Sequence, residues 1–265
     1  MIAPQVIKKQ SREWGPKPDA VEKHYILGWI LYGIVKSSIV KSLVFKGGTA
    51  LSKIHYPSDW RLSEDLDFTV LDDTKWETII KALSDEVPKI VQRDGKISIT
   101  LRKKPHTNPD YLQAKMKYTG PLGPGTIKVE ISKEGFVGNT KIEPVPNNPD
   151  EFDYPEFSVN VYSVETIAAE KIRAILQRGY IRDYYDVWRL FKEKKFDQKE
   201  ARKTFDEKCR TKGVKFSGID DFFPTNIAHT LNEHLPSIMR LTREKLPPIG
   251  TILGELREYL AQFLK

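Results

Sequence analysis

The chain has 265 residues, of which 39% are hydrophobic and 30% charged, with a formal net charge of +7 and a single cysteine, Cys209. This is the composition of a globular protein with a full-sized core, and the longest apolar run, residues 25–35, is too short to span a bilayer. The start lacks the apolar region of a secretory signal, one cysteine excludes an internal disulfide or a thiolate zinc cluster, and the histidines show no metalloprotease spacing. We therefore expect a cytoplasmic protein, and its positive charge mildly favours an anionic partner such as a nucleotide or nucleic acid.

The hydrophobic pattern predicts an amino-terminal half that mixes helices and strands. It starts with a long helix over residues 18–41, and a short buried strand then runs into the turn Gly47-Gly48. A short helix follows, with Thr49 as its candidate N-cap. The next predicted elements are a strand over residues 65–70, an amphipathic helix over 74–91, and strands over 96–104, 111–120 and 126–132.

The second half reads differently. Residues 137–155 are polar and rich in Asn and Pro, and they are the best candidate for a linker or long loop. Beyond them almost every segment predicts helix, beginning with residues 163–179 and 182–195. We expect an α+β fold, with a mixed sheet and flanking helices in residues 1–155 and a helical domain in residues 156–265.

Two carboxylates mark the strand over residues 65–70. The alternation of a strand puts Asp65 and Asp67 on one face and apolar side chains on the other. Two such acids repel each other unless a cation lies between them, and a pair of Mg²⁺ ions would meet that need. Glu130 would add a third carboxylate if its strand were a neighbour, a set that suits a two-metal mechanism. The alternative is an exposed edge strand whose acids are solvated.

The turn Gly47-Gly48 follows a strand and precedes a helix, an arrangement that lets backbone N–H groups approach a phosphate. Lys46 and Lys53 flank it with positive charge, although the sequence is neither a P-loop nor a dinucleotide-binding motif. The alternative is a plain tight turn. The conjunction with Arg61, Ser63 and the aspartate pair, less than 20 residues further on, is more specific than any of its parts.

Charged residues occupy core-facing positions in the later helices. Lys171 falls within the apolar stripe of the helix over residues 164–178, and Arg178 lies near the same line, so this helix directs positive charge at an anion or its lysine reaches back to the surface. In the next helix Asp183 shares a face with apolar residues and Asp186 lies at its edge. Asp183 is either the N-cap of that helix, or one of these acids pairs with Lys171 or Arg182 or orients an acceptor hydroxyl.

Four segments in this order resemble the AbiEii/AbiGii toxin family: KGGTALSK (46–53), RLSEDLDFTV (61–70), VETIAAEKIRAIL (164–176) and RDYYDVW (182–188). The resemblance covers about residues 40–190 and implies a nucleotidyltransferase fold of the DNA-polymerase-β-like superfamily. By motif position it implies a Mg²⁺ site, with Mn²⁺ as an alternative, at Asp65 and Asp67 with Glu130 as third acid, and catalytic roles for Lys171, Asp183 and Asp186. The residues it implies for nucleotide binding are Gly47, Gly48 and Thr49, with Ser63 just ahead of the aspartate pair. We expect Lys46, Lys53 or Arg61 to supply positive charge to the same nucleotide.

The resemblance further implies transfer of a nucleoside monophosphate from an NTP to an acceptor hydroxyl, with RNA such as tRNA as the favoured acceptor. It also implies a toxin of a toxin–antitoxin or phage-defence system, with an antitoxin protein as a partner. From the sequence itself we expect no membrane association and a helical half that completes the active-site cleft. Three alternatives stay open: an inert nucleotide- or RNA-binding module, a protein-modifying nucleotidyltransferase, and an interaction protein held by a partner.

Overall fold

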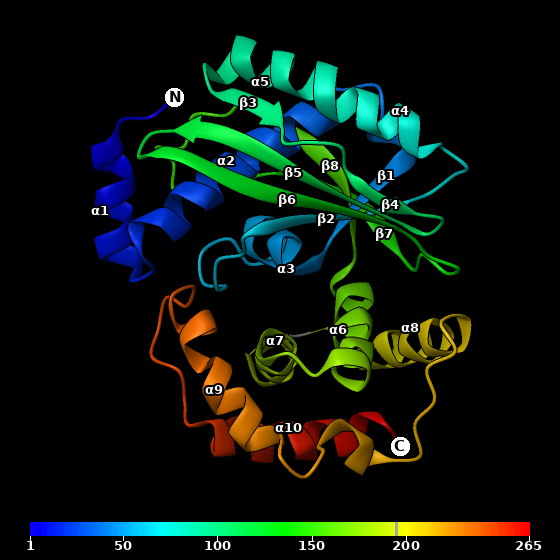
Figure 1. Cartoon of the computed structure of the whole chain (residues 1–265). Helices are drawn as coiled ribbons and strands as arrows, with labels where there is room; N and C mark the ends of the chain where they lie inside the picture. The colour runs from blue at the N-terminus through cyan, green and yellow to red at the C-terminus, as the bar shows by residue number, and fades with distance from the viewer. Residues whose placement is uncertain (194–195) are drawn as a thin grey trace. The chain divides into compact units, whose positions relative to one another are not determined.

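The computed structural model of the chain describes residues 1–193 and 196–265 and divides it into two compact units (Figure 1). The first unit consists of Met1–Glu134, Thr140–Val161 and Leu241–Glu244; the second consists of Gly135–Asn139, Tyr162–Arg240 and Lys245–Lys265. The predicted division into residues 1–155 and 156–265 has one boundary, whereas each of these units is made of three separate segments of the chain. Within the described ranges, no helix has the length and apolar character that crossing a bilayer requires.

The first unit is built on a mixed sheet, as predicted, with eight strands in the part of the chain that the structure describes. β2 runs parallel to β6 and antiparallel to β1, and β8 runs parallel to β1. The strand order is β3 (Ser98–Leu101), β5 (Tyr111–Gly120), β6 (Gly123–Lys133), β2 (Asp65–Val70), β1 (Leu43–Lys46), β8 (Ser158–Tyr162) and β7 (Thr140–Pro144), with β4 (His106–Asn108) paired to β5.

The two faces of this sheet differ in polarity because the side chains of its central strands alternate. Leu66 and Phe68 of β2 are buried, and so are Val129 and Ile131 of β6. The helix α2 packs on this apolar face against β2, β5 and β6, and α5 packs on α2 and β3 (Figure 1). The helices of the unit are α1 (Pro4–Trp14), α2 (Pro18–Val35), α3 (Gly47–Ala50), α4 (Trp76–Lys81) and α5 (Val87–Gly95). The polar face is the one that carries the two aspartates.

Residues 137–155 are more ordered than a linker. They contain β7, and their aromatic side chains enter the core of the first unit, where the ring of Phe152 lies 5.1 Å from that of Tyr25 and the ring of Tyr154 lies 6.2 Å from that of Trp29. The Asn- and Pro-rich composition concealed this, because burial of these two rings depends on α2, more than a hundred residues earlier.

A short segment near the carboxyl end of the chain, Leu241–Glu244, belongs to the first unit. Its first carbonyl accepts a hydrogen bond of 2.8 Å from the N–H of Leu62. The guanidinium of Arg243 lies 3.9 Å from the ring centroid of Trp14 and donates a hydrogen bond of 3.0 Å to the carbonyl of Pro57. This segment, hereafter the strap, therefore fastens the loop that leads into β2.

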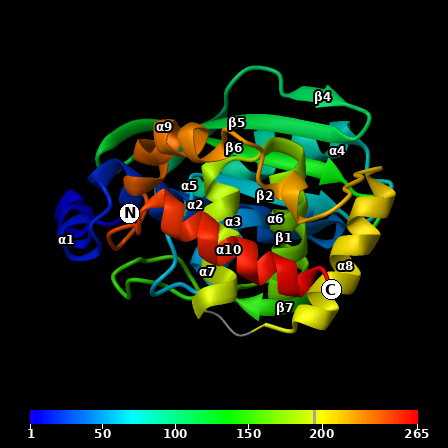
Figure 2. The same ribbon diagram turned by 90° about the horizontal axis from the view of Figure 1, so that it is seen from below.

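The second unit is helical in the described residues, as expected (Figure 2). Its helices are α6 (Val164–Arg178), α7 (Ile181–Glu193), α8 (Gln198–Thr211), α9 (Ile227–Met239) and α10 (Ile249–Phe263). Contacts of α6 with α7 and α8, and of α10 with α7 and α9, enclose an apolar core that includes Tyr184, Phe205 and Leu256. Ser163 caps α6, since its Oγ accepts the N–H of Thr166 at 3.2 Å.

Candidate active site

The predicted neighbourhood of β2 and β6 is confirmed, and the register brings the three acids to one face of the sheet. The strands are parallel, with Asp67 opposite Glu130 and Asp65 opposite Lys128. Residues opposite each other in a sheet point to the same side. The side chains of Asp65 and Glu130 are 23% and 27% exposed, so a solute can reach both acids.

Lys128 lies between two of these acids. Its Nζ is 3.1 Å from Oδ2 of Asp65 and 3.4 Å from Oε1 of Glu130, and Gln113 donates a 2.9 Å hydrogen bond to the same Oε1. Partial burial alone would lower the pKa of Lys128, but the two carboxylates outweigh it and raise the pKa above its ordinary value. The sheet therefore contains its own counter-ion where the sequence predicts a need for positive charge. The sequence prediction did not include Lys128 among the site residues. The alternation of the strand, which puts Lys128 on the same face as Glu130, was the signal that could have identified it.

The glycine turn packs directly against Asp67. Gly47 has a φ of +80°, and a Cβ built on it would lie 2.3 Å from Oδ2 of Asp67. A Cβ on Gly48 would lie 3.2 Å from Nη2 of Arg61 and 3.3 Å from Oγ of Ser63. At position 47 only glycine leaves room for the carboxylate and adopts this φ without strain, whereas at position 48 a Cβ would press on Arg61 and Ser63. The turn, Asp67, Arg61 and Ser63 are thus brought together, although they come from separate segments.

Thr49 is not the N-cap of its helix. The helix α3 begins at Gly47, with Lys46 in the N-cap position, and a π-type turn over Leu51–His55 continues it. Thr49 is fully buried, and its hydroxyl donates a 2.5 Å hydrogen bond to the carbonyl of Asp65. Its side chain therefore ties the glycine turn to β2.

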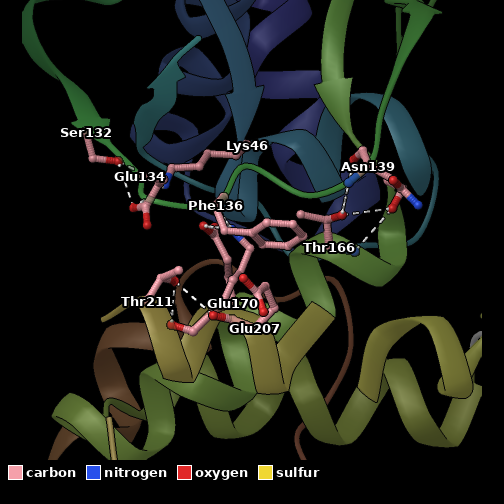
Figure 3. A network of polar contacts seen from close by, with 11 residues as sticks. Lys46, Ser132, Glu134, Phe136, Asn139, Thr166, Glu170, Glu207 and Thr211 are labelled. Carbon is pink, nitrogen blue, oxygen red and sulfur yellow. Dashed lines mark hydrogen bonds and ion pairs between the residues drawn. The ribbon is translucent and has the colours of Figure 1, made fainter. Parts of the chain in front are cut away.

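The two flanking lysines have different environments. The Nζ of Lys46 lies on the polar face, 3.1 Å from Oγ of Ser132 and 3.4 Å from Oε1 of Glu134 (Figure 3). Lys53 is only 2% exposed, and its Nζ lies 5.5 Å from the ring centroid of Tyr154. Burial, helped by the charge of Arg243, lowers the pKa of Lys53 to about 7. The expectation that Lys53 offers a charge beside the turn does not match this buried position.

In the second unit, Lys171 meets two buried acids. Its Nζ lies 3.2 Å from Oδ1 of Asp183 and 2.9 Å from Oδ2 of Asp186, and Nε of Arg178 lies 2.8 Å from Oδ2 of Asp183. Both acids are fully buried and Lys171 is 9% exposed. Burial pushes the pKa of Asp183 up, but Lys171 and Arg178 overcome this and hold the pKa below its ordinary value.

The expected pairing of Lys171 with these acids is therefore confirmed. The surface-reaching alternative for Lys171 is wrong. The N-cap alternative for Asp183 is also wrong, because Asp183 lies inside the first turn of α7 and its carboxylate faces α6.

The sequence reasoning missed another buried lysine, Lys208 of α8. Its Nζ lies 3.1 Å from Oε1 of Glu170, donates to the carbonyl of Phe136 at 3.2 Å and lies 4.9 Å from the ring centroid of Tyr162. Figure 3 shows Phe136 and Glu170 in this network, with Asn139 hydrogen-bonded to Thr166 close by. No motif marks Lys208, since it lies in the tail beyond the family resemblance.

The family model described as "Nucleotidyl transferase AbiEii toxin, Type IV TA system" matches residues 29–252. The chain belongs to this family. As an AbiEii-family protein it is a nucleotidyltransferase of a toxin family, and the match extends well past residue 190, where the recognisable sequence motifs end.

Two solved structures share the fold of this AbiEii-family chain. MenT4, a nucleotidyltransferase toxin from Mycobacterium tuberculosis H37Rv, is 17% identical with a TM-score of 0.72, over 100% of this chain and 90% of that one. JHP933 from Helicobacter pylori is 16% identical with a TM-score of 0.54, over 94% of both chains. A search of curated proteins finds no match.

The donor chemistry of the AbiEii-family site fits a hard divalent cation. Asp65, Asp67 and Glu130 offer carboxylate oxygens, the ligands that Mg²⁺ and Mn²⁺ prefer, and Lys128 shows that this face already attracts a cation. In the described residues, however, no group of three or more His, Cys, Asp or Glu side chains is arranged to hold a metal ion. The acids would have to turn from Lys128 toward the metal.

Proposed function

We propose that this nucleotidyltransferase transfers a nucleoside monophosphate from an NTP to a hydroxyl group of an RNA at the polar face of β1, β2 and β6. The observation that carries this proposal is the contact of the Gly47 backbone with the carboxylate of Asp67, in register with Glu130. A glycine turn whose N–H groups could bind phosphate and a set of acids suited to a divalent cation are the two parts that phosphoryl transfer needs.

In this proposal the glycine turn holds the triphosphate. The N–H groups of Gly47 and Gly48 would approach phosphate oxygens, because neither residue has a side chain in the way. Arg61 and Ser63 lie beside Gly48 and would bind the same group, and Lys46 would add charge from the edge of the site. Thr49 would contribute through its backbone, since its hydroxyl is engaged by Asp65.

Asp65 and Asp67, with Glu130, would hold Mg²⁺ or Mn²⁺, and the bound metal would neutralise charge on the phosphates and on these acids. In the reaction the acceptor oxygen forms a bond to the α-phosphorus, the bond from this phosphorus to the α–β bridging oxygen breaks, pyrophosphate leaves, and the hydroxyl proton is released to water. The chain's own contribution is to position the triphosphate and the acceptor and to stabilise charge.

The catalytic roles of Lys171, Asp183 and Asp186 stay predictions, as does the helical half completing the cleft. The contacts within the second unit already satisfy the charge of Lys171. The toxin role follows the family, and we propose a cognate antitoxin as its partner, within a type IV toxin–antitoxin system.

The proposal is tested by incubating the purified protein with Mg²⁺ or Mn²⁺, each labelled NTP and total RNA. We expect label to enter RNA, and Asp67→Asn to lower the rate by at least about 100-fold, because one ligand and one negative charge are lost. Asp73→Asn is the matched control, since Asp73 is exposed just beyond the same strand, and it should keep the wild-type rate.

Three outcomes would count against the proposal. An Asp67→Asn protein as active as wild type would place the chemistry elsewhere. Label in the protein instead of the RNA would favour the protein-modifying alternative. Wild-type protein that binds RNA but transfers no label with either metal would favour the inert module.

A further inference from the structure

A cationic groove lies where β3, β4 and β5 meet, in the first unit. It has a volume of about 290 Å³ and is lined by side chains of the β3–β4 connection and of β5. We call it the β4 groove. The lining residues that matter for its chemistry are Arg102, Lys103, Lys104, His106, Gln113 and Lys115.

The charge of the β4 groove is not balanced within the protein. Arg102, Lys103, Lys104 and Lys115 are all exposed, and no carboxylate lines the groove. In the described part of the chain these four side chains form no ion pair, unlike Lys46, which binds Glu134 just after β6, and Lys128, which binds Asp65 of β2. A cluster of exposed cations without counter-ions attracts a polyanion.

The groove opens on the face of the sheet that carries the acids. In the β5–β6 pairing, Gln113 lies opposite Glu130 and Lys115 lies opposite Lys128. The 2.9 Å hydrogen bond from Gln113 to Glu130 shows that the side chain of Gln113 points to that face. Since β2 is the next strand after β6, the wall of the groove formed by β5 is about 10 Å from the aspartates, at roughly 4.8 Å per strand spacing.

We propose that the β4 groove binds the sugar-phosphate backbone of the acceptor RNA next to the hydroxyl that receives the nucleotide. This inference rests on the proposed function, because it concerns the second substrate of the same site. The four cations would contact phosphates, and the exposed ring of His106 would stack on a base. An RNA fits better than an acidic peptide, because β5, which forms one wall of the groove, lies only two strands from the aspartates at which the acceptor must react.

The test compares two triple variants that remove the same charge. The groove variant carries Arg102→Gln, Lys103→Gln and Lys104→Gln. The control carries Lys75→Gln, Lys81→Gln and Lys89→Gln, which are exposed residues in or next to α4 and α5, the helices on the side of the apolar face. Binding of a fluorescent RNA oligonucleotide is measured by anisotropy over a series of salt concentrations, without NTP, and binding of labelled NTP is measured separately.

We expect the groove variant to bind RNA at least about 10-fold more weakly at low salt. The slope of log affinity against log salt should fall by about 2, the loss of three phosphate contacts on a single strand. The control should stay within about twofold of wild type, and both variants should bind NTP normally and keep the wild-type melting temperature, because all six positions are exposed.

Equal losses in both variants would overturn the inference, since net charge alone would then explain RNA binding. A groove variant with wild-type RNA affinity would also overturn it and would leave the groove to an acidic partner. The proposed function fails separately. If RNA binding depends on the groove but no label is transferred, the proposed function is wrong and the groove proposal stands. If the groove variant binds and labels RNA as well as wild type does, the groove proposal is wrong and the proposed function stands.

Discussion

At the scale of single residues, the contact between Gly47 and Asp67 explains why a glycine is needed at this position of the motif. The strand pattern already placed Asp65 and Asp67 on one face, and the register confirms that face. What the sequence could not show is that the Asp67 carboxylate occupies the space where a side chain of residue 47 would be. That contact joins two segments twenty residues apart, and no local preference encodes it.

Gly47→Ala tests this contact. The new methyl group would meet Oδ2 of Asp67, and the residue would be held at a φ of +80°, so we expect a loss of about 1–2 kcal/mol in unfolding free energy and a fall in nucleotide transfer of at least about 10-fold. Gly213→Ala is the control, because Gly213 has a φ of +63° with nothing within 4 Å of its Cβ. It should lose only the part of the stability that the positive φ accounts for, and it should keep its transfer rate. Equal activity in the two variants would argue against a role for the turn.

Lys53 shows where residue-level prediction stops. Its position beside the glycine turn suggested a phosphate contact, but the lysine is buried beneath Tyr154, from a segment that the sequence marked as linker. A buried ammonium without an acid beside it is unfavourable, and this lowers its pKa.

The pH dependence follows from the sign of that shift. The pKa of Lys53 falls from 10.5 to about 7 on folding, so the unfolded chain binds the extra proton between these values. The resulting loss of stability is complete below about pH 7 and disappears as the pH rises toward 10.5. We expect Lys53→Met to raise the unfolding free energy by about 1–3 kcal/mol at pH 7, a gain that shrinks with increasing pH. Denaturant unfolding across this range measures it. Lys41→Met, at an exposed site, should show no such trend, and a pH-independent difference for Lys53→Met would contradict the buried charge.

At the scale of elements, the helix projection correctly placed Lys171 on the buried side of α6, because a single apolar stripe marks that side. It could not identify what Lys171 meets, since the acids lie on α7, which packs against α6. The same limit applies to the sheet. The alternation of β6 put Lys128 and Glu130 on one face, but pairing with β2, more than sixty residues earlier, decides that Lys128 bridges two acids.

Lys171→Met separates a structural role from a catalytic one. Removal of the ammonium leaves two fully buried carboxylates with less positive charge, and we expect a loss of about 3–5 kcal/mol in unfolding free energy. Lys192→Met removes a solvent-exposed ion pair with Glu255 and should lower the unfolding free energy far less than Lys171→Met does. Unchanged denaturation of Lys171→Met together with lost transfer activity would instead favour the phosphate contact implied by the family resemblance.

At the scale of the whole molecule, the sequence predicted the mixed sheet, the flanking helices and the helical second half. These follow from periodicity, which is local. The exchange of segments between the two units is not local, and nothing in the composition of Leu241–Glu244 separates it from the rest of the connection between α9 and α10. Its membership of the first unit depends on partners at Trp14, Pro57 and Leu62, close to the other end of the chain.

The strap has a consequence for synthesis. A ribosome makes the glycine turn and the aspartate strand early, but the loop ahead of that strand gains its fastening only when Leu241–Glu244 has left the exit tunnel. The nascent polypeptide therefore carries every proposed metal ligand long before the loop that leads into β2 is fastened. The fold of the first unit is therefore finished only after most of the helical unit has been made, because the strap follows α9 in the chain.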